Sequence, residues 1–157
     1  MMHIAKSIDY KLLGISSTSF IAGGEIPVKY TCDGANTSPS LDIKGIPEEA
    51  ICLALIMDDP DGPIGTWVHW VVWNIPVTHH IKENEIHGVE GLNDFQQHHY
   101  GGPCPPSGTH HYYFKIYALD ALLDLPGITK QFQLEKAMSE HIIAYGELMG
   151  LYTRNKQ

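Results

Sequence analysis

The chain has 157 residues, of which 43% are hydrophobic and 18% are charged, and its formal net charge is −8. This length suits one domain, and this apolar content is too high for a disordered segment, so we expect residues 1–157 to form a single domain. An acidic chain is a poor ligand for nucleic acid and for anionic membrane surfaces, which excludes both as general partners. The net charge does not exclude a local anion site, because a pocket responds to the groups nearest to it.

The N-terminal stretch and the cysteines bear on location. Residues 1–15 lack a basic segment followed by a continuous apolar run, which predicts neither a signal peptide nor a membrane insertion. The three cysteines, Cys32, Cys52 and Cys104, are widely spaced and odd in number. We therefore expect three free thiols and a cytoplasmic protein.

Short β-prone segments separated by Gly and Pro predict a mostly β architecture. The candidate strands are residues 25–31, 51–57, 67–75 and 112–119. Residues 51–57 are continuously apolar, as in a strand that is buried on both faces. Strict alternation in residues 67–75 places His69 on the same face as Val71 and Trp73.

The apolar period changes near the C-terminus and predicts a helix within residues 131–149. Gly150 is its expected stop signal, and His141 is expected to be a hydrogen-bonded core residue of the helix. The other positions at helical spacing are Leu134, Ala137, Met138, Ile142, Tyr145, Leu148 and Met149.

Two loops have unusual compositions. Residues 58–63 read Asp-Asp-Pro-Asp-Gly-Pro directly after the buried strand, and carboxylates there are costly unless they are solvated, paired or functional. Residues 101–108 carry three prolines in four positions and flanking glycines, and such a rigid loop can direct N–H groups toward an anion. Taken alone, an acidic turn explains residues 58–63 equally well, and a rigid connection between strands is the favoured explanation of residues 101–108.

The ten histidines include the pairs 79–80, 98–99 and 110–111. Neighbouring residues on a strand point to opposite faces, so each pair offers at most one metal ligand per face. There is no His-Glu-x-x-His motif and no Cys-x-x-Cys motif. The sequence therefore predicts no metal and no cofactor, and it predicts surface positions for His79, His80, His98 and His99.

Four polar residues are candidates for one site. His69 lies in a nearly apolar strand ten residues after Asp59, and His110 and Tyr112 share one face of another strand. If these strands are neighbours, the four side chains converge. Imidazolium and phenol groups donate to phosphate oxygens, and a carboxylate can orient a histidine. The alternative for each residue is an isolated, hydrogen-bonded core position.

These segments resemble the signatures of the phosphatidylethanolamine-binding protein family. Residues 58–63 with Trp-Val-His-Trp at 67–70 resemble the first signature, and residues 101–112 resemble the second. Residues 26–39 are similar to bacterial and archaeal members, and residues 146–152 resemble the end of their closing helix. The resemblance extends over about residues 12–154.

The resemblance implies a Greek-key β-sandwich of two antiparallel sheets with a few peripheral helices, one of them near the C-terminus. It also implies a pocket for phosphate or a phosphorylated head group, and bacterial relatives imply a homodimer. His111 stands where family members usually have Arg, so a permanent charge and its fork of donors are lost. The ligand-binding residues implied by motif position are Asp59, His69, Gly102, Pro105, His110 and Tyr112.

Three functions remain open. The first is an anion-binding module that modulates a partner protein, as Raf kinase inhibitor-like and protease inhibitor-like relatives do. The second is a hydrolase or phosphoesterase with Asp59 and His69 as acid–base groups, although the sequence has no Gly-x-Ser-x-Gly elbow and no two-metal ligand set. The third is a lipid carrier, for which the sequence shows no hydrophobic tunnel. The residues favour binding over catalysis.

Overall fold

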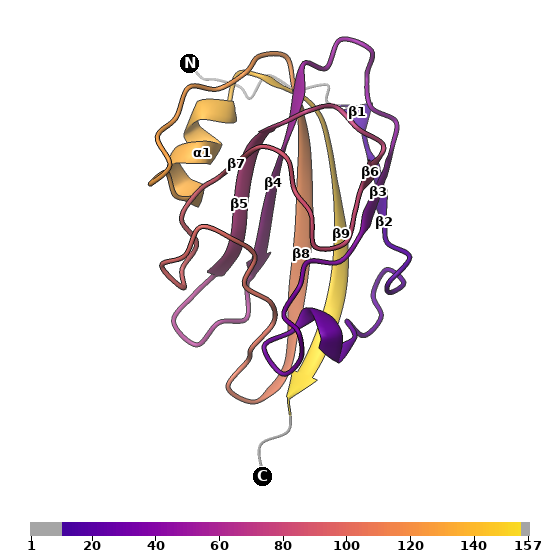
Figure 1. The fold of residues 1–157 in the computed structure, drawn as a ribbon, viewed down its shortest axis with the longest axis vertical. Coiled ribbons are helices and arrows are strands. Elements are labelled where there is room, and N and C mark those ends of the chain that lie inside the picture. The colour runs from indigo at the N-terminus through magenta and orange to yellow at the C-terminus, as the bar shows by residue number, and fades with distance from the viewer. Residues whose placement is uncertain (1–10, 155–157) are drawn as a thin grey trace, which may run out of the picture.

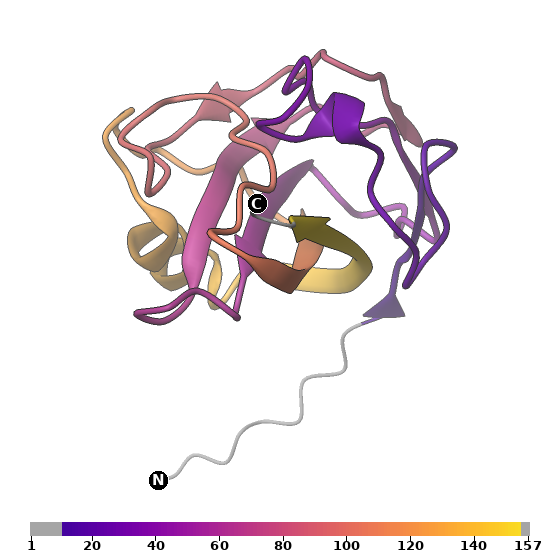
Figure 2. The same cartoon turned by 90° about the horizontal axis from the view of Figure 1, so that it is seen from below.

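A computed structural model describes residues 11–154. Residues 1–10 lie outside it, and they include most of the stretch for which the sequence predicts no signal peptide. Two sheets pack face to face, and one helix, α1 (Gln131–Met138), covers the outer face of the larger sheet (Figure 1 and Figure 2). The predicted mainly β sandwich with a helix near the C-terminus is confirmed.

The larger sheet has six strands in the order β1-β9-β8-β4-β5-β7, and the smaller has the order β2-β3-β6. Neighbouring strands are antiparallel, with the exception of the parallel pair β1–β9 at one edge. The strands of the larger sheet are β1 (Lys11–Leu12), β9 (Ile142–Arg154), β8 (Gly108–Leu119), β4 (Cys52–Asp59), β5 (Trp67–Ile75) and β7 (Val89–Glu90). Those of the smaller sheet are β2 (Gly14–Ser16), β3 (Leu41–Lys44) and β6 (His80–Ile81).

Strand β4 is buried on both faces, as its continuous apolar run predicts. One face contributes to the core between the two sheets, and the other packs with Leu134 and Met138 of α1. Alternation along the strand therefore sends neighbouring residues into different cores. The inner positions are Leu53, Leu55 and Met57, and the outer positions are Cys52, Ala54 and Ile56.

The predicted C-terminal helix is wrong beyond Met138, because residues Ile142–Arg154 form the long strand β9. Its buried positions alternate through residues 144, 146, 148, 150 and 152, whereas Ile142, Tyr145 and Met149, which fitted the helical spacing, are only partly buried. Gly150 is not a stop signal. A Cβ there would lie 2.6 Å from Cγ1 of Ile26, so this glycine lets the N-terminal segment pack against β9.

Two further expectations are wrong. Residues 25–31 form no strand: Glu25 makes an isolated bridge to Leu151, and the 3₁₀-helix η1 (Val28–Tyr30) follows Pro27, which fixes its own φ and lacks an N–H. His141 is not a core residue. It follows the end of α1 and is partly exposed, with its Nδ1 2.8 Å from an oxygen of Asp120.

The expectation of three free thiols is also wrong. Cys32 and Cys104 form a disulfide with their Cα atoms 5.4 Å apart, and Cys52 is a buried free cysteine. The bonded residues are separated by 72 positions, and cysteine spacing carries no information about which distant loops meet. The prediction of a cytoplasmic location therefore loses its argument from free thiols.

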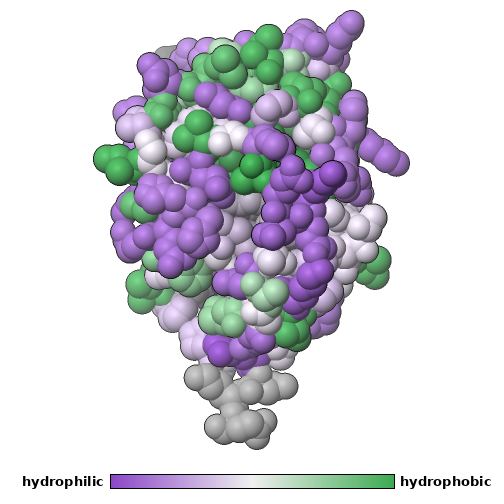
Figure 3. Space-filling view, in the orientation of Figure 1, coloured by the Kyte–Doolittle hydropathy of each residue, from purple (hydrophilic) through white to green (hydrophobic). Residues whose placement is uncertain are grey.

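The surface is mixed in polarity. The face shown in Figure 3 is largely hydrophilic, with hydrophobic residues interspersed toward its upper end. Within residues 11–154, the structure contains no helix with the length and apolar character that crossing a membrane requires.

Candidate functional site

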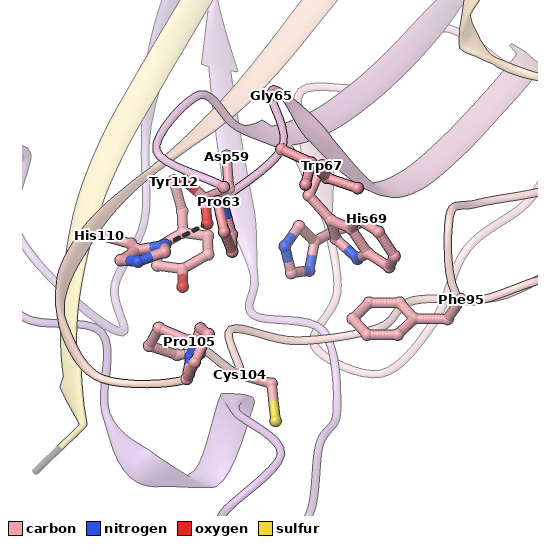
Figure 4. A pocket seen from close by; sticks show the side chains of 13 residues that line it. Asp59, Pro63, Gly65, Trp67, His69, Phe95, Cys104, Pro105, His110 and Tyr112 are labelled. Atoms are coloured by element: carbon pink, nitrogen blue, oxygen red, sulfur yellow. Dashed lines mark hydrogen bonds and ion pairs between the residues drawn. The ribbon is translucent and has the colours of Figure 1, made fainter. Parts of the chain in front are cut away.

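A cavity of about 230 Å³ opens where the C-terminal end of β4 lies beside the N-terminal ends of β5 and β8 (Figure 4). Five of the six predicted ligand-binding residues line it, and Gly102 is not among the lining residues. The thirteen lining residues are Asp59, Gly62, Pro63, Ile64, Gly65, Trp67, His69, Phe95, Cys104, Pro105, Pro106, His110 and Tyr112.

Three neighbouring strands supply the polar groups. The strands of His69 and Tyr112 are not direct neighbours, because β4 runs between β5 and β8. Asp59, the last residue of β4, pairs with Trp67 of β5 and follows Asp58, which pairs with Tyr113 of β8. The intervening strand therefore supplies the carboxylate between the two histidine-bearing strands.

A β-bulge positions His69. Met57 pairs with Trp70 and the next residue, Asp58, pairs with Val68, so His69 is an extra residue in β5. A bulge changes the direction in which its side chains point. The imidazole faces the cavity, and its centroid lies 5.4 Å from that of the Tyr112 ring.

The predicted common face of His69, Val71 and Trp73 is therefore wrong. Val71 and Trp73 belong to the cluster packed with α1, on the opposite side of the sheet from the core that includes Tyr112. The bulge shifts the alternation by one residue, and an apolar pattern that is hydrophobic on both faces gives no sign of that shift.

Asp59 and His110 form a buried pair. Oδ2 of Asp59 lies 2.6 Å from Nδ1 of His110, and the side chains are only 5% and 11% exposed. The other carboxylate oxygen accepts the N–H of Asp61 at 2.7 Å. With Nδ1–H donated to the carboxylate, Nε2 of His110 remains for a ligand. Asp59 is thus hydrogen-bonded to His110 and not to His69.

His69 donates instead to the backbone. Its Nδ1 lies 2.6 Å from the carbonyl oxygen of Gly101, which can only accept, so Nδ1 carries a proton. Burial lowers the pKa of His69, and the Gly101 carbonyl and the charge of Asp59 oppose that shift only in part. The ring is therefore neutral near pH 7, and its Nε2 is an acceptor.

The hydroxyl of Tyr112 has no hydrogen-bond partner within the described part of the chain, although the residue is fully buried. Burial raises the pKa of Tyr112, and the negative charge of Asp59 raises it further, so the phenol stays protonated. The hydroxyl points into the cavity (Figure 4). A buried donor without a partner costs about 1–3 kcal/mol, and such a group in a native fold calls for an explanation.

Sequence reasoning did not assign the aromatic wall formed by Trp67 and Phe95. The Phe95 centroid lies 5.5 Å from that of Trp67 and 5.3 Å from that of His69. Buried Asn93 holds this loop, since its Oδ1 accepts the N–H of Phe95 and its Nδ2 donates to the carbonyl of His69. The Asn-Asp pair at 93–94, a common turn signal, is the one sequence feature that marks the loop.

Gly102 lies behind the cavity wall. Its N–H donates to Oδ1 of Asn36 at 2.8 Å, which leaves no backbone donor at this position for a ligand. A Cβ at Gly102 would lie 2.2 Å from the carbonyl oxygen of Tyr30. The structure thus gives Gly102 a packing role, whereas Pro105 and Pro106 form the wall itself.

The other histidines within residues 11–154 are not among the residues that line the cavity. His79, His80, His98 and His99 are exposed, and residues 11–154 contain no group of three His, Cys, Asp or Glu side chains that could hold a metal ion. His111, on the outer face of β8, lies 2.7 Å from an oxygen of Asp61. That hydrogen bond lowers the pKa of the Asp61 carboxyl group. The same hydrogen bond anchors the acidic loop beside the cavity.

Comparison with known proteins identifies relatives of this chain. Residues 16–153 match the family model described as phosphatidylethanolamine-binding protein. A UPF0098 protein of Pyrococcus abyssi is 51% identical over 141 residues, covering 82% of this chain and 79% of the relative. A UPF0098 protein of Chlamydia trachomatis is 45% identical over 149 residues, covering 90% of this chain and 99% of the relative.

Two solved structures share the fold. The crystal structure of the putative phosphatidylethanolamine-binding protein homolog CT736 from Chlamydia trachomatis superposes with a TM-score of 0.88 at 41% identity, covering 92% of this chain and 99% of that one. The structure of Escherichia coli YbcL, described as a member of the mammalian PEBP family, gives a TM-score of 0.84 at 30% identity, covering 91% and 99%. The chain belongs to the phosphatidylethanolamine-binding protein family.

Proposed function

We propose that the cavity binds a phosphate-like anion, such as a phosphorylated head group. The observation that carries the proposal is the unpartnered hydroxyl of Tyr112, which faces the same cavity as His69 and His110. A tetrahedral anion presents several oxygens in different directions, so one ligand can meet polar groups that come from different strands.

The charges at the site define the ligand further. No Lys or Arg is among the lining residues, and Asp59 lies within hydrogen-bond distance of His110. Tyr112 supplies a donor, whereas neutral His69 supplies an acceptor. The preferred ligand is therefore a singly protonated phosphate or phosphomonoester, whose P–OH group donates to His69 while its other oxygens accept.

The family description names phosphatidylethanolamine, and this supports a phosphorylated head group as the ligand of this chain. In this proposal the ligated protein modulates a partner protein, as the resemblance to kinase and protease inhibitors suggests, and it acts as a homodimer in the cytoplasm. The lining offers no channel for acyl chains, because the cavity of about 230 Å³ is small for a whole lipid.

A hydrolase remains the alternative, because the Asp59–His110 pair has the form of an oriented general base. No serine, threonine or free cysteine lines the cavity, so this reaction would need water as its nucleophile. Steady-state assays with phosphomonoesters and peptide esters separate the functions. Turnover that is abolished in both His110→Ala and Asp59→Asn would favour the enzyme.

Calorimetry with inorganic phosphate and phosphoethanolamine tests the binding proposal. A hydrogen bond to a charged group contributes about 1.5–3 kcal/mol, so we expect His69→Ala to weaken binding roughly tenfold or more. His79→Ala is the matched control, because His79 is exposed and lies outside the cavity. Equal losses in the two variants, or no binding by the wild type, would show that the site is assigned wrongly.

A further inference from the structure

The disulfide lies in the wall of the proposed anion pocket. Cys104 is one of the lining residues, and its partner Cys32 comes from the loop after η1. Both residues are only partly buried, so a small thiol reagent can reach them.

The wall around Cys104 has few other restraints. Residues 103, 105 and 106 are prolines, which have no N–H to donate to a neighbouring segment. Two hydrogen bonds join this loop to the 31–36 segment: the N–H of Cys32 donates to the carbonyl of Pro103, and the N–H of Gly102 donates to Asn36. The disulfide is the covalent part of the same attachment, so its loss releases the segment that carries Pro105.

A cation lies next to one of the two sulfur atoms. Nη1 of Arg154 lies 3.4 Å from Sγ of Cys104, and Nη2 lies 3.1 Å from a carboxylate oxygen of Asp33. A neighbouring guanidinium stabilises a thiolate, and a thiol with a lower pKa is a better leaving group in thiol–disulfide exchange. The arrangement therefore favours attack on Cys32 with departure of the Cys104 sulfur.

We infer that the Cys32–Cys104 disulfide is a redox-exchange site that controls the anion pocket, and that its reductant is a dithiol. This inference rests on the proposed function. In the oxidised protein the wall is held against the ligand, and in the reduced protein it is released and the anion binds more weakly. By linkage, a bound anion must shift the equilibrium between disulfide and dithiol toward the oxidised protein, by the same factor by which reduction weakens anion binding.

The exchange is balanced in thiols and electrons. A thiolate of the dithiol attacks Sγ of Cys32, the Cys32–Cys104 bond breaks, and its electron pair remains on Cys104 as a thiolate beside Arg154. The second thiol of the dithiol then attacks the mixed disulfide and releases Cys32. The protein disulfide gains two electrons, and the dithiol leaves as its own disulfide after giving up two protons.

The test compares oxidised wild type, wild type reduced with dithiothreitol, and the double variant Cys32→Ser/Cys104→Ser. Inorganic phosphate is titrated calorimetrically into each one. Coupling between sites amounts to roughly fivefold or more, so we expect both disulfide-free forms to bind at least about five times more weakly than the oxidised form. Equal affinity in all three forms would overturn the inference and leave the proposed function intact.

A second measurement does not depend on ligand binding. The amide hydrogens of Cys32 and Gly102 form the two hydrogen bonds beside the disulfide, and we expect both to exchange faster with solvent after reduction. If oxidised protein binds no phosphate, the proposed function is wrong and the pocket-control inference fails with it. Unchanged amide exchange would refute release of the wall even if phosphate binds.

A substitution at Arg154 tests whether its guanidinium stabilises the departing Cys104 sulfur. Arg154→Gln is expected to slow reduction by dithiothreitol severalfold, measured by alkylation of the new thiols and mass spectrometry. Lys44→Gln, which removes one positive charge from β3 in the smaller sheet, is the matched control. Equal rates in Arg154→Gln and wild type would show that Arg154 does not stabilise the departing Cys104 sulfur.

Discussion

Removal of the hydroxyl of Tyr112 has opposite expected effects on stability and on binding. The ring is fully buried in the core between the sheets, and the hydroxyl has no partner within residues 11–154. Tyr112→Phe keeps the ring and removes an unsatisfied donor, so we expect the free energy of unfolding to rise by about 1 kcal/mol. The same change removes a donor from the pocket, so we expect phosphate affinity to fall roughly tenfold.

Tyr100→Phe is the matched control for stability. Tyr100 is also buried, but its hydroxyl donates to the carbonyl of Tyr30 at 2.7 Å. Loss of that donor leaves a buried carbonyl unsatisfied, so we expect the free energy of unfolding to fall by about 1–3 kcal/mol. Urea denaturation measures both stabilities, and calorimetry with inorganic phosphate measures binding. If Tyr112→Phe is destabilised as much as Tyr100→Phe, or binds phosphate as tightly as wild type, the reasoning about Tyr112 is refuted.

Four further predictions concern pH, packing and a buried charge. Burial lowers the pKa of His69 below its value in the unfolded chain, so the unfolded chain binds the proton more readily. The free energy of unfolding should therefore be highest above about pH 6.5 and should decrease as the pH falls. Urea denaturation at a series of pH values should show a smaller decrease in acid for His69→Phe than for wild type. Phosphate binding should strengthen as the pH falls through this range, because the ligand or His69 must carry a proton, and a pH-independent affinity would contradict this. Gly102→Ala should lower the free energy of unfolding by about 1–3 kcal/mol because its Cβ meets the backbone, whereas Gly127→Ala, with no atom within 4 Å, should not. Lys115→Met should lower the free energy of unfolding at pH 7 by about 1–3 kcal/mol, because buried Asp58 is left without its cation. The destabilisation should become smaller in acid, where Asp58 takes up a proton. Equal destabilisation at pH 7 and pH 4 would contradict this reasoning.

Hydrophobic pattern predicted the central strands well. Residues 51–57 are apolar without interruption because β4 separates two cores, and the alternation in β8 sends Tyr112 inward and Lys115 outward. The pattern failed at β9 because its apolar residues lie on both faces: Ile142, Tyr145 and Met149 are partly buried, Leu148 is buried, and these four positions also satisfy a helical spacing. Gly150 added to the error, because a glycine that admits a packed neighbour and a glycine that ends a helix look the same in a sequence.

The disulfide shows a different limit of prediction from the sequence. A sequence gives the number and spacing of cysteines, but the pairing depends on which loops the fold brings together. Here η1 and the proline-rich loop meet at the end of the sandwich through residues 72 positions apart. The odd number of cysteines therefore led to a prediction of three free thiols, although Cys52 alone is unpaired in the structure.

The candidate site depends on features that interrupt regular structure. Asp59 ends β4, and Pro105 belongs to a loop that cannot continue a ladder of hydrogen bonds. His69 is the extra residue of a bulge; with regular alternation it would point with Val71 toward α1, away from Tyr112. Hydrophobic periodicity therefore identifies the strands that carry these residues, but it predicts the wrong face of β5 for His69. The motif resemblance grouped His69 with Asp59, His110 and Tyr112, which line the same cavity. A signature reflects the folded geometry, including its irregular positions, whereas a period describes only the regular part of a strand.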